Sequence, residues 1–90
     1  MITLNLRYTT WIITVTGKWD EWFESESKTI IDIISELDKR YSGFKDIFFP
    51  PNVGKLNIRT GINLVRAGEP PRGIIDPGEK LHDKDLLIFY

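Results

Sequence analysis

The chain has 90 residues, with 12 basic and 13 acidic side chains in interspersed order and no cysteine. This length suits one domain, in which only about 60 to 65% of the unfolded chain's surface can be buried. The lack of cysteine excludes disulfides, zinc-thiolate sites, iron-sulfur clusters and thiol nucleophiles. Because the balanced charge gives no basic surface, we expect neither nucleic acid nor a membrane as a partner.

Residues 2–6 alternate between apolar and polar side chains, which predicts a half-buried strand. They lack the charged start and continuous apolar run of a signal peptide, and no segment reaches the ~20 apolar residues of a membrane span. We therefore expect a cytoplasmic protein. Residues 19–24 predict a second strand, antiparallel to the first. Residues 8–16 are rich in β-branched side chains and either extend one of these strands or form a long ordered loop.

A helix is predicted within residues 27–44. Thr29 is the expected N-cap, with its hydroxyl accepting from the backbone N–H of Asp32, and Gly43 is expected to end the helix in a left-handed conformation. A helix of this length is marginal alone in water, so it must pack against a sheet. The apolar side chains recur every three or four positions and form one stripe, made of Ile30, Ile33, Ile34, Leu37, Tyr41 and Phe44.

Two further strands are expected after the helix. Residues 45–55 contain two adjacent prolines and predict an irregular link, whereas residues 56–66 alternate and predict a strand that is interrupted at Gly61. Residues 86–90 are continuously apolar, which suits a central strand buried on both faces or one whose outer face a partner covers. One main helix across a mixed sheet of four to five strands is an α+β, β-grasp arrangement, here a single domain over residues 1–90.

Several passages, taken in order, resemble a known family. Residues 16–18, followed by acidic strand residues, resemble the link between its first strands, and residues 28–41 resemble its helix. Residues 64–69 resemble the strand and turn before its variable loop, and residues 81–89 resemble its last turn and apolar strand. The family is that of the ubiquitin-like sulfur carriers, which includes the small subunit of molybdopterin synthase and the thiamine sulfur carrier.

The resemblance implies a β-grasp protein that is not an enzyme and needs no cofactor. It also implies a protein partner: an E1-like adenylating enzyme, the large subunit of a synthase or another enzyme subunit, with a homodimer as a further arrangement. The family's last strand is followed by a tail ending in two glycines, whose carboxylate is adenylated and converted to a thiocarboxylate. Because this sequence ends at Tyr90, on the predicted strand, we expect no such chemistry on it.

Two hypotheses about function follow from the resemblance. The first is a docking or accessory subunit, related to the small subunit used in molybdenum cofactor biosynthesis, that acts through its sheet face and C-terminal strand. The alternative is a genuine sulfur carrier, for molybdopterin, thiamine or tRNA thiolation, whose glycine tail is absent from this chain.

The candidate interface lies on the outer face of the last two strands. If Leu64, Leu87 and Phe89 face the helix, alternation places the residues between them on the opposite face. Exposed apolar clusters of this kind commonly mark protein interfaces. The other interpretation is that residues 8–22 fold over this face and bury it as core. The candidate interface residues are Asn63, Val65, Leu86, Ile88 and Tyr90.

Other conspicuous side chains suggest weaker hypotheses. Trp11, Trp19 and Trp22 serve either core packing or binding, and because Trp19 and Trp22 are three residues apart, at least one should be exposed. The only histidine, His82, stands beside residues 83–85 in a polar turn, where a solvated loop is favoured over a metal or acid-base cluster. We expect no catalytic, cofactor-binding or metal-binding residue.

Overall fold

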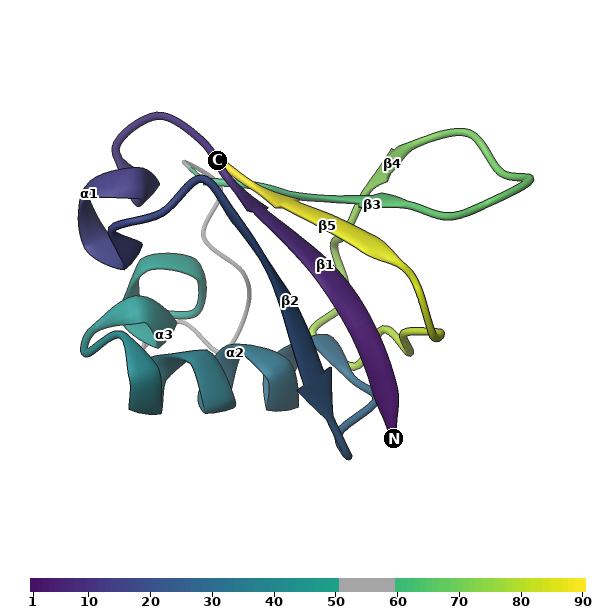
Figure 1. The fold of residues 1–90 in the computed structure, drawn as a ribbon, viewed down its shortest axis with the longest axis horizontal. Coiled ribbons are helices and arrows are strands. Elements are labelled where there is room, and N and C mark those ends of the chain that lie inside the picture. Colours follow the sequence, from purple (N-terminus) through teal and green to yellow (C-terminus); the bar gives the residue numbers. More distant parts are fainter. Residues whose placement is uncertain (51–59) are drawn as a thin grey trace.

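The protein is described by a computed structural model that covers residues 1–50 and 60–90. The strands of these residues form one sheet in the order β2, β1, β5, β3, β4 (Figure 1). β1 and β5 pair in parallel and the other neighbours pair antiparallel, so the sheet is mixed. The elements in chain order are β1 (Ile2–Tyr8), α1 (Ile12–Thr16), β2 (Asp20–Ser25), α2 (Ile30–Arg40), α3 (Phe44–Phe48), β3 (Ile62–Val65), β4 (Arg72–Gly73) and β5 (Leu86–Phe89).

The main helix, α2, crosses one face of the sheet (Figure 1). Its apolar stripe is fully buried at Ile30, Ile33, Ile34 and Leu37. Every second residue of the strands faces this helix, since β1, β3 and β5 each alternate between buried and less buried positions. The expected β-grasp arrangement is therefore confirmed, with α2 as the single long helix of the described residues.

Thr29 is the N-cap of α2, as predicted, but the hydrogen bonds at its start and the position of its end differ from the sequence prediction. The Thr29 hydroxyl donates to the Asp32 carboxylate at 2.9 Å, and the free N–H of Ile30 instead donates to the Glu79 carbonyl at 3.0 Å. The helix ends at Arg40, and Gly43, with φ of 88°, precedes α3 rather than capping α2. A carbonyl in a distant turn thus accepts the hydrogen bond of a free backbone N–H at the helix start, and local sequence patterns do not reveal this contact.

Residues 8–16 adopt neither of the two conformations that were expected. Ile12–Thr16 forms the short helix α1, and Gly17 ends it in a left-handed conformation with φ of 76°. Ile12 is completely buried in the core, so burial of this side chain outweighs the β-propensity of its neighbours. The expected loop is therefore replaced by a helical turn at the end of the sheet.

The segment after α2 is helical in its first part, where an irregular link was expected. α3 buries Phe44 and Phe48, whose rings lie 5.3 and 5.2 Å from the ring of Phe89 on β5. These aromatic contacts attach the end of β5 to the helical layer.

The strand expected over residues 56–66 is seen only as Ile62–Val65, since residues 56–59 lie outside the described part of the chain.

A carboxylate enclosed between the sheet and α2 ties β2 to the helix. The side chain of Glu21 is only 9% exposed, and it accepts hydrogen bonds from the hydroxyls of Tyr8 and Tyr41, each at 2.6 Å. Arg40 donates to its other oxygen at 2.7 Å. Burial alone would raise the pKa of Glu21, but the bonds from Tyr41 and Tyr8 and the nearby cations Lys18 and Arg40 hold it below its usual value.

The lowered pKa of Glu21 predicts acid sensitivity. A carboxylate with a lower pKa in the folded than in the unfolded chain stabilises the fold above its unfolded pKa, and this contribution is lost as pH falls through its folded pKa. We therefore expect Glu21→Gln to destabilise the protein at pH 7 and to flatten the decline in unfolding free energy below about pH 4. Denaturant unfolding from pH 7 to pH 3 measures both effects. Glu24→Gln, an exposed change on the same strand, should alter neither, and an unchanged slope in Glu21→Gln would contradict the assignment.

Candidate protein interface

The five candidate residues do share one side of the sheet, the side opposite α2. Their strand neighbours Ile62, Leu64, Leu87 and Phe89 are buried against the helices. The candidates on β3 and β5 are half-buried, and Tyr90 is 45% exposed. We call this surface the open face, and it consists of Asn63, Val65, Leu86, Ile88 and Tyr90.

Strand pairing brings the open face together from β3 and β5, with β1 along its border. Val65 on β3 is directly opposite Leu86 on β5, and Asn63 is opposite Ile88. On the other side of β5, the parallel partner β1 places Asn5 beside Leu86 and Arg7 beside Ile88. Three apolar side chains therefore meet at the centre of the sheet, and a cation stands at their border.

Sequence reasoning missed Arg7 as a neighbour of this surface. Its place on the outer face of β1 follows from the alternation of residues 2–6, but its position beside Ile88 depends on the parallel pairing of β1 with β5. Arg7 is exposed, and within the described residues it makes no ion pair. It thus offers a positive charge beside an apolar cluster.

Tyr90 extends the open face beyond the end of β5. Its backbone exchanges two hydrogen bonds with Gly61, at 2.8 and 3.0 Å, and its hydroxyl donates to the side-chain oxygen of Asn63 at 3.4 Å. The ring covers Gly61 so closely that a Cβ there would lie 2.3 Å from it. A side chain at position 61 would therefore have to displace the exposed ring of Tyr90. β3 begins only after Gly61, at Ile62, although the backbone of Gly61 still pairs with Tyr90.

A buried ion pair holds β3 and β5 in register below the open face. Arg66 donates through Nε and Nη2 to the two carboxylate oxygens of Asp85, at 3.0 and 2.8 Å. The Asp85 side chain is 2% exposed and also accepts from the backbone N–H of His82 at 2.8 Å. Burial alone would raise the pKa of Asp85, but these bonds keep it below its ordinary value.

Residues 8–22 do not cover the open face, contrary to the second interpretation. α1 lies toward α3 in Figure 1, and its residue Ile12 belongs to the core between sheet and helices. Trp19 and Trp22 are 75% and 64% exposed, which confirms the expectation for this pair. Trp22 lies on the outer side of β2 opposite Asn5, with the Lys84 Nζ 5.7 Å from its ring centre. No element of the described residues lies over the five residues of the open face.

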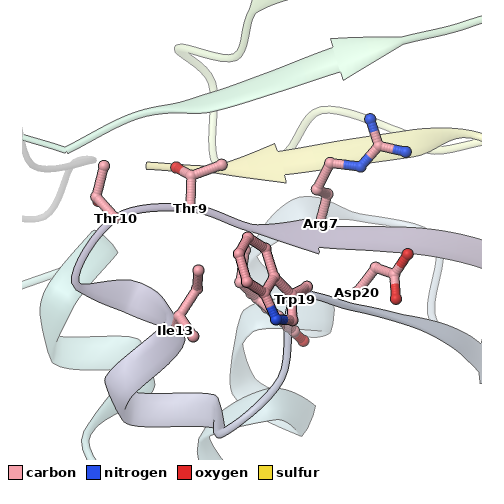
Figure 2. A pocket seen from close by; sticks show the side chains of 7 residues that line it. Arg7, Thr9, Thr10, Ile13, Trp19 and Asp20 are labelled. Atoms are coloured by element: carbon pink, nitrogen blue, oxygen red, sulfur yellow. The ribbon is translucent and has the colours of Figure 1, made fainter.

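A hollow of about 330 Å³ lies at the end of the sheet, between α1 and the ends of β1 and β2. Figure 2 shows Trp19 in the middle of its wall, with Thr10 and Ile13 to one side and Arg7 and Asp20 to the other. The sequence singled out Trp19 but not this hollow, because the hollow exists only through the helical turn of α1. The hollow adds exposed apolar surface next to Arg7, on the side of Arg7 away from the open face.

His82 is exposed and begins a turn in which the backbone N–H of Asp85 donates to its carbonyl at 3.2 Å. Among residues 1–50 and 60–90, no group of three or more histidine, aspartate or glutamate side chains is arranged to hold a metal ion. None of the helices in this part of the chain is long and apolar enough to cross a membrane.

Comparison with known proteins shows likeness in structure only. No protein-family model and no curated protein sequence matches the chain. A Pyrococcus furiosus protein described as molybdopterin converting factor, subunit 1, superposes with a TM-score of 0.71 and 22% identity, covering 99% of this chain and 95% of its own. Small archaeal modifier protein 1 of Haloferax volcanii gives a TM-score of 0.70 and 19% identity, with the same coverages of 99% and 95%.

A third similar structure is the HVO 2177 protein of Haloferax volcanii, with a TM-score of 0.74 and 17% identity over 98% of this chain and 80% of its own. At these identities the likeness establishes a shared fold. The β-grasp of this chain is therefore of the type found in molybdopterin converting factor subunits and small archaeal modifier proteins.

Removing the carboxylate of Asp85 should strongly destabilise the fold. Asp85→Ala leaves the mostly buried Arg66 guanidinium without its paired anion, and we expect a loss of about 3 kcal/mol in unfolding free energy. Glu69→Ala is the matched control, because Glu69 is the other carboxylate near Arg66, at 3.9 Å, but is 51% exposed. It should cost less than about 0.5 kcal/mol. Equal losses for the two variants in urea unfolding would show that the buried pair does not hold the strands.

Proposed function

We propose that this protein is a non-enzymatic docking or accessory subunit that binds a protein partner through the open face. The observation that carries the proposal is the apolar centre formed by Val65, Leu86 and Ile88 on a side of the sheet that the described elements leave uncovered. Burial of such surface by a partner is favourable at roughly 25 cal/mol per Å² of apolar area. A protein contact is thus the use that this surface supports best.

The border of the open face would give the contact its specificity. Asn63 offers an amide, Tyr90 a hydroxyl, and Arg7 a positive charge that forms no ion pair among the described residues, although Asp20 stands opposite it in the pairing of β1 with β2. Interfaces of this kind combine an apolar centre with a polar rim, and the rim selects the partner more than it adds affinity. We infer a partner surface that is apolar at its centre and carries an acidic group to face Arg7.

The similar structures suggest the class of partner. A molybdopterin converting factor described as subunit 1 implies a second subunit, and a modifier protein must meet the enzyme that attaches it. By this analogy the partner would be the large subunit of a synthase, an E1-like adenylating enzyme or another enzyme subunit, in a cytoplasmic pathway such as molybdenum cofactor biosynthesis. A second copy of this chain is the remaining alternative.

The proposal predicts that Ile88→Asp prevents partner binding. A carboxylate at the centre of the patch would be desolvated without a counter-charge, so we expect affinity to fall at least tenfold, about 1.4 kcal/mol. The partner would be isolated from the source cells with the tagged protein, purified, and titrated calorimetrically against the wild type and the variant. Tyr90→Ala should weaken the same contact, since it removes an exposed aromatic anchor.

Ile75→Asp is the matched control for Ile88→Asp. Ile75 is 86% exposed and lies after β4, outside the open face, so this variant should bind normally. Thermal unfolding must show that Ile88→Asp remains cooperatively folded. Equal weakening by both variants, normal binding of Ile88→Asp, or its unfolding would each contradict an interface at this face.

A second candidate function is that of a sulfur carrier. It is favoured by the coverage of the molybdopterin converting factor subunit, which this fold matches over 95% of that chain. The intact mass of the protein purified from its source tests it. A mass that includes a glycine-ended tail, or that shows sulfur in place of oxygen, would support the carrier. A mass corresponding to residues 1–90 without modification would contradict it.

A further inference from the structure

The outer edge of β2 is a row of unpaired backbone groups. Tyr8 donates its N–H to the Trp19 carbonyl at 2.7 Å, and these two residues continue the register in which Leu6 pairs with Glu21 and Leu4 with Phe23. In an antiparallel pair, every second residue directs its N–H and C=O to the neighbouring strand. Glu21, Phe23 and Ser25 therefore bond to β1, and the backbone groups of the residues between them point away from the sheet.

Those outward residues are Asp20, Trp22 and Glu24. Within the described residues none of their backbone groups has a partner, and β2 stands at the edge of the sheet. Natural edge strands are protected by charged side chains, proline, a bulge or shortness. β2 has no proline or bulge, is six residues long and pairs with β1 without a break, so its protection comes from the charges of Asp20, Glu21 and Glu24. It is a template only for a strand whose side chains complement these charges.

The side chains along this edge define what could bind there. Asp20 and Glu24 are exposed on the outer side, flank Trp22, and make no ion pair with any described residue. Trp22 is 64% exposed between them. On the inner side, a shallow hollow next to Phe23 is lined by Glu24, Glu36, Lys39 and Arg40, and Arg40 is already paired with Glu21. The outer side of the edge is thus acidic, whereas the inner side carries both charges.

A second copy of this chain does not suit the edge. If two β2 strands paired antiparallel around Trp22, each Asp20 would face the Glu24 of the other copy, and like charges directly opposite one another are destabilising. A foreign strand with basic side chains at these two places meets no such penalty. Charge complementarity therefore favours a different protein as the occupant.

We propose that β2 binds an extended segment of a partner protein as an added strand, with Lys or Arg opposite Asp20 and Glu24 and an apolar residue opposite Trp22. Since side chains alternate between faces, the two basic residues are four positions apart, and the middle one of the three positions between them faces Trp22. The other two positions lie on the inner side, next to Phe23 and the hollow of mixed charge, and are neutral and apolar. Backbone hydrogen bonds to the edge supply affinity, and the spacing of the basic residues supplies specificity.

The probe is the peptide acetyl-Ser-Lys-Val-Ile-Val-Lys-Ser-amide, titrated into the full chain labelled with nitrogen-15. The control is acetyl-Ser-Val-Lys-Ile-Lys-Val-Ser-amide, which has the same composition but moves both lysines to the inner side, away from their positions opposite Asp20 and Glu24. We expect the probe to slow hydrogen exchange at the amides of Asp20, Trp22 and Glu24 at least tenfold. The control should bind at least tenfold more weakly, and added salt should weaken binding of the probe.

The double variant Asp20→Asn, Glu24→Gln tests the edge from the protein side. Both residues are exposed, and neutral amides put no like charge opposite Arg7 on β1, so the variant should fold and should lose at least tenfold in affinity for the probe. Equal binding of the two peptides, no binding at millimolar peptide, or protection confined to Leu86 and Ile88 would overturn the proposal. Protection of the edge amides in concentrated protein without peptide would assign the edge to a second copy and would also overturn it.

Discussion

The parallel pairing of β1 with β5 is the constraint on which the rest of the structure depends. It places the first and last strands of the described chain side by side at the centre of the sheet, and the segments between them must cross one face to connect them. That crossing is made by α2, whose apolar stripe then has a continuous apolar face to cover. Because side chains alternate along a strand, this one pairing also fixes which residues remain on the opposite face.

Two buried carboxylates hold the outer parts of the sheet to this centre. Glu21 joins β2 to the end of α2, and Asp85 joins the start of β5 to Arg66 after β3. Each is largely enclosed and fully bonded, which is the condition under which a buried charge is tolerated. The Glu21 network thus holds β2 in position, and the Asp85–Arg66 ion pair holds β3 and β5.

The open face and the edge of β2 offer contacts of different kinds. The open face presents an apolar centre with a cation at its border, whereas the edge presents backbone groups between two acidic side chains. Asn5 of β1 separates Leu86 of the open face from Trp22 of the edge. The two surfaces share no residue, but Arg7 at the border of the open face lies opposite Asp20 of the edge. One partner with both an apolar patch and a basic strand could use the two surfaces together.

The sequence by itself determined the periodic features: the buried stripe of α2 from Ile30 to Leu37, a strand within residues 56–66, and the shared side of the five residues of the open face. These follow from side-chain spacing, which burial on one face imposes directly. The expected extension of the stripe to Tyr41 and Phe44 is wrong, because α2 ends at Arg40. Only the tertiary structure decided the helical turn at Ile12, the capping of α2 by the turn near Glu79, and the position of Arg7 beside Ile88. Each of these depends on residues far apart in the chain, and local propensity is too weak to overcome burial or pairing with such distant partners.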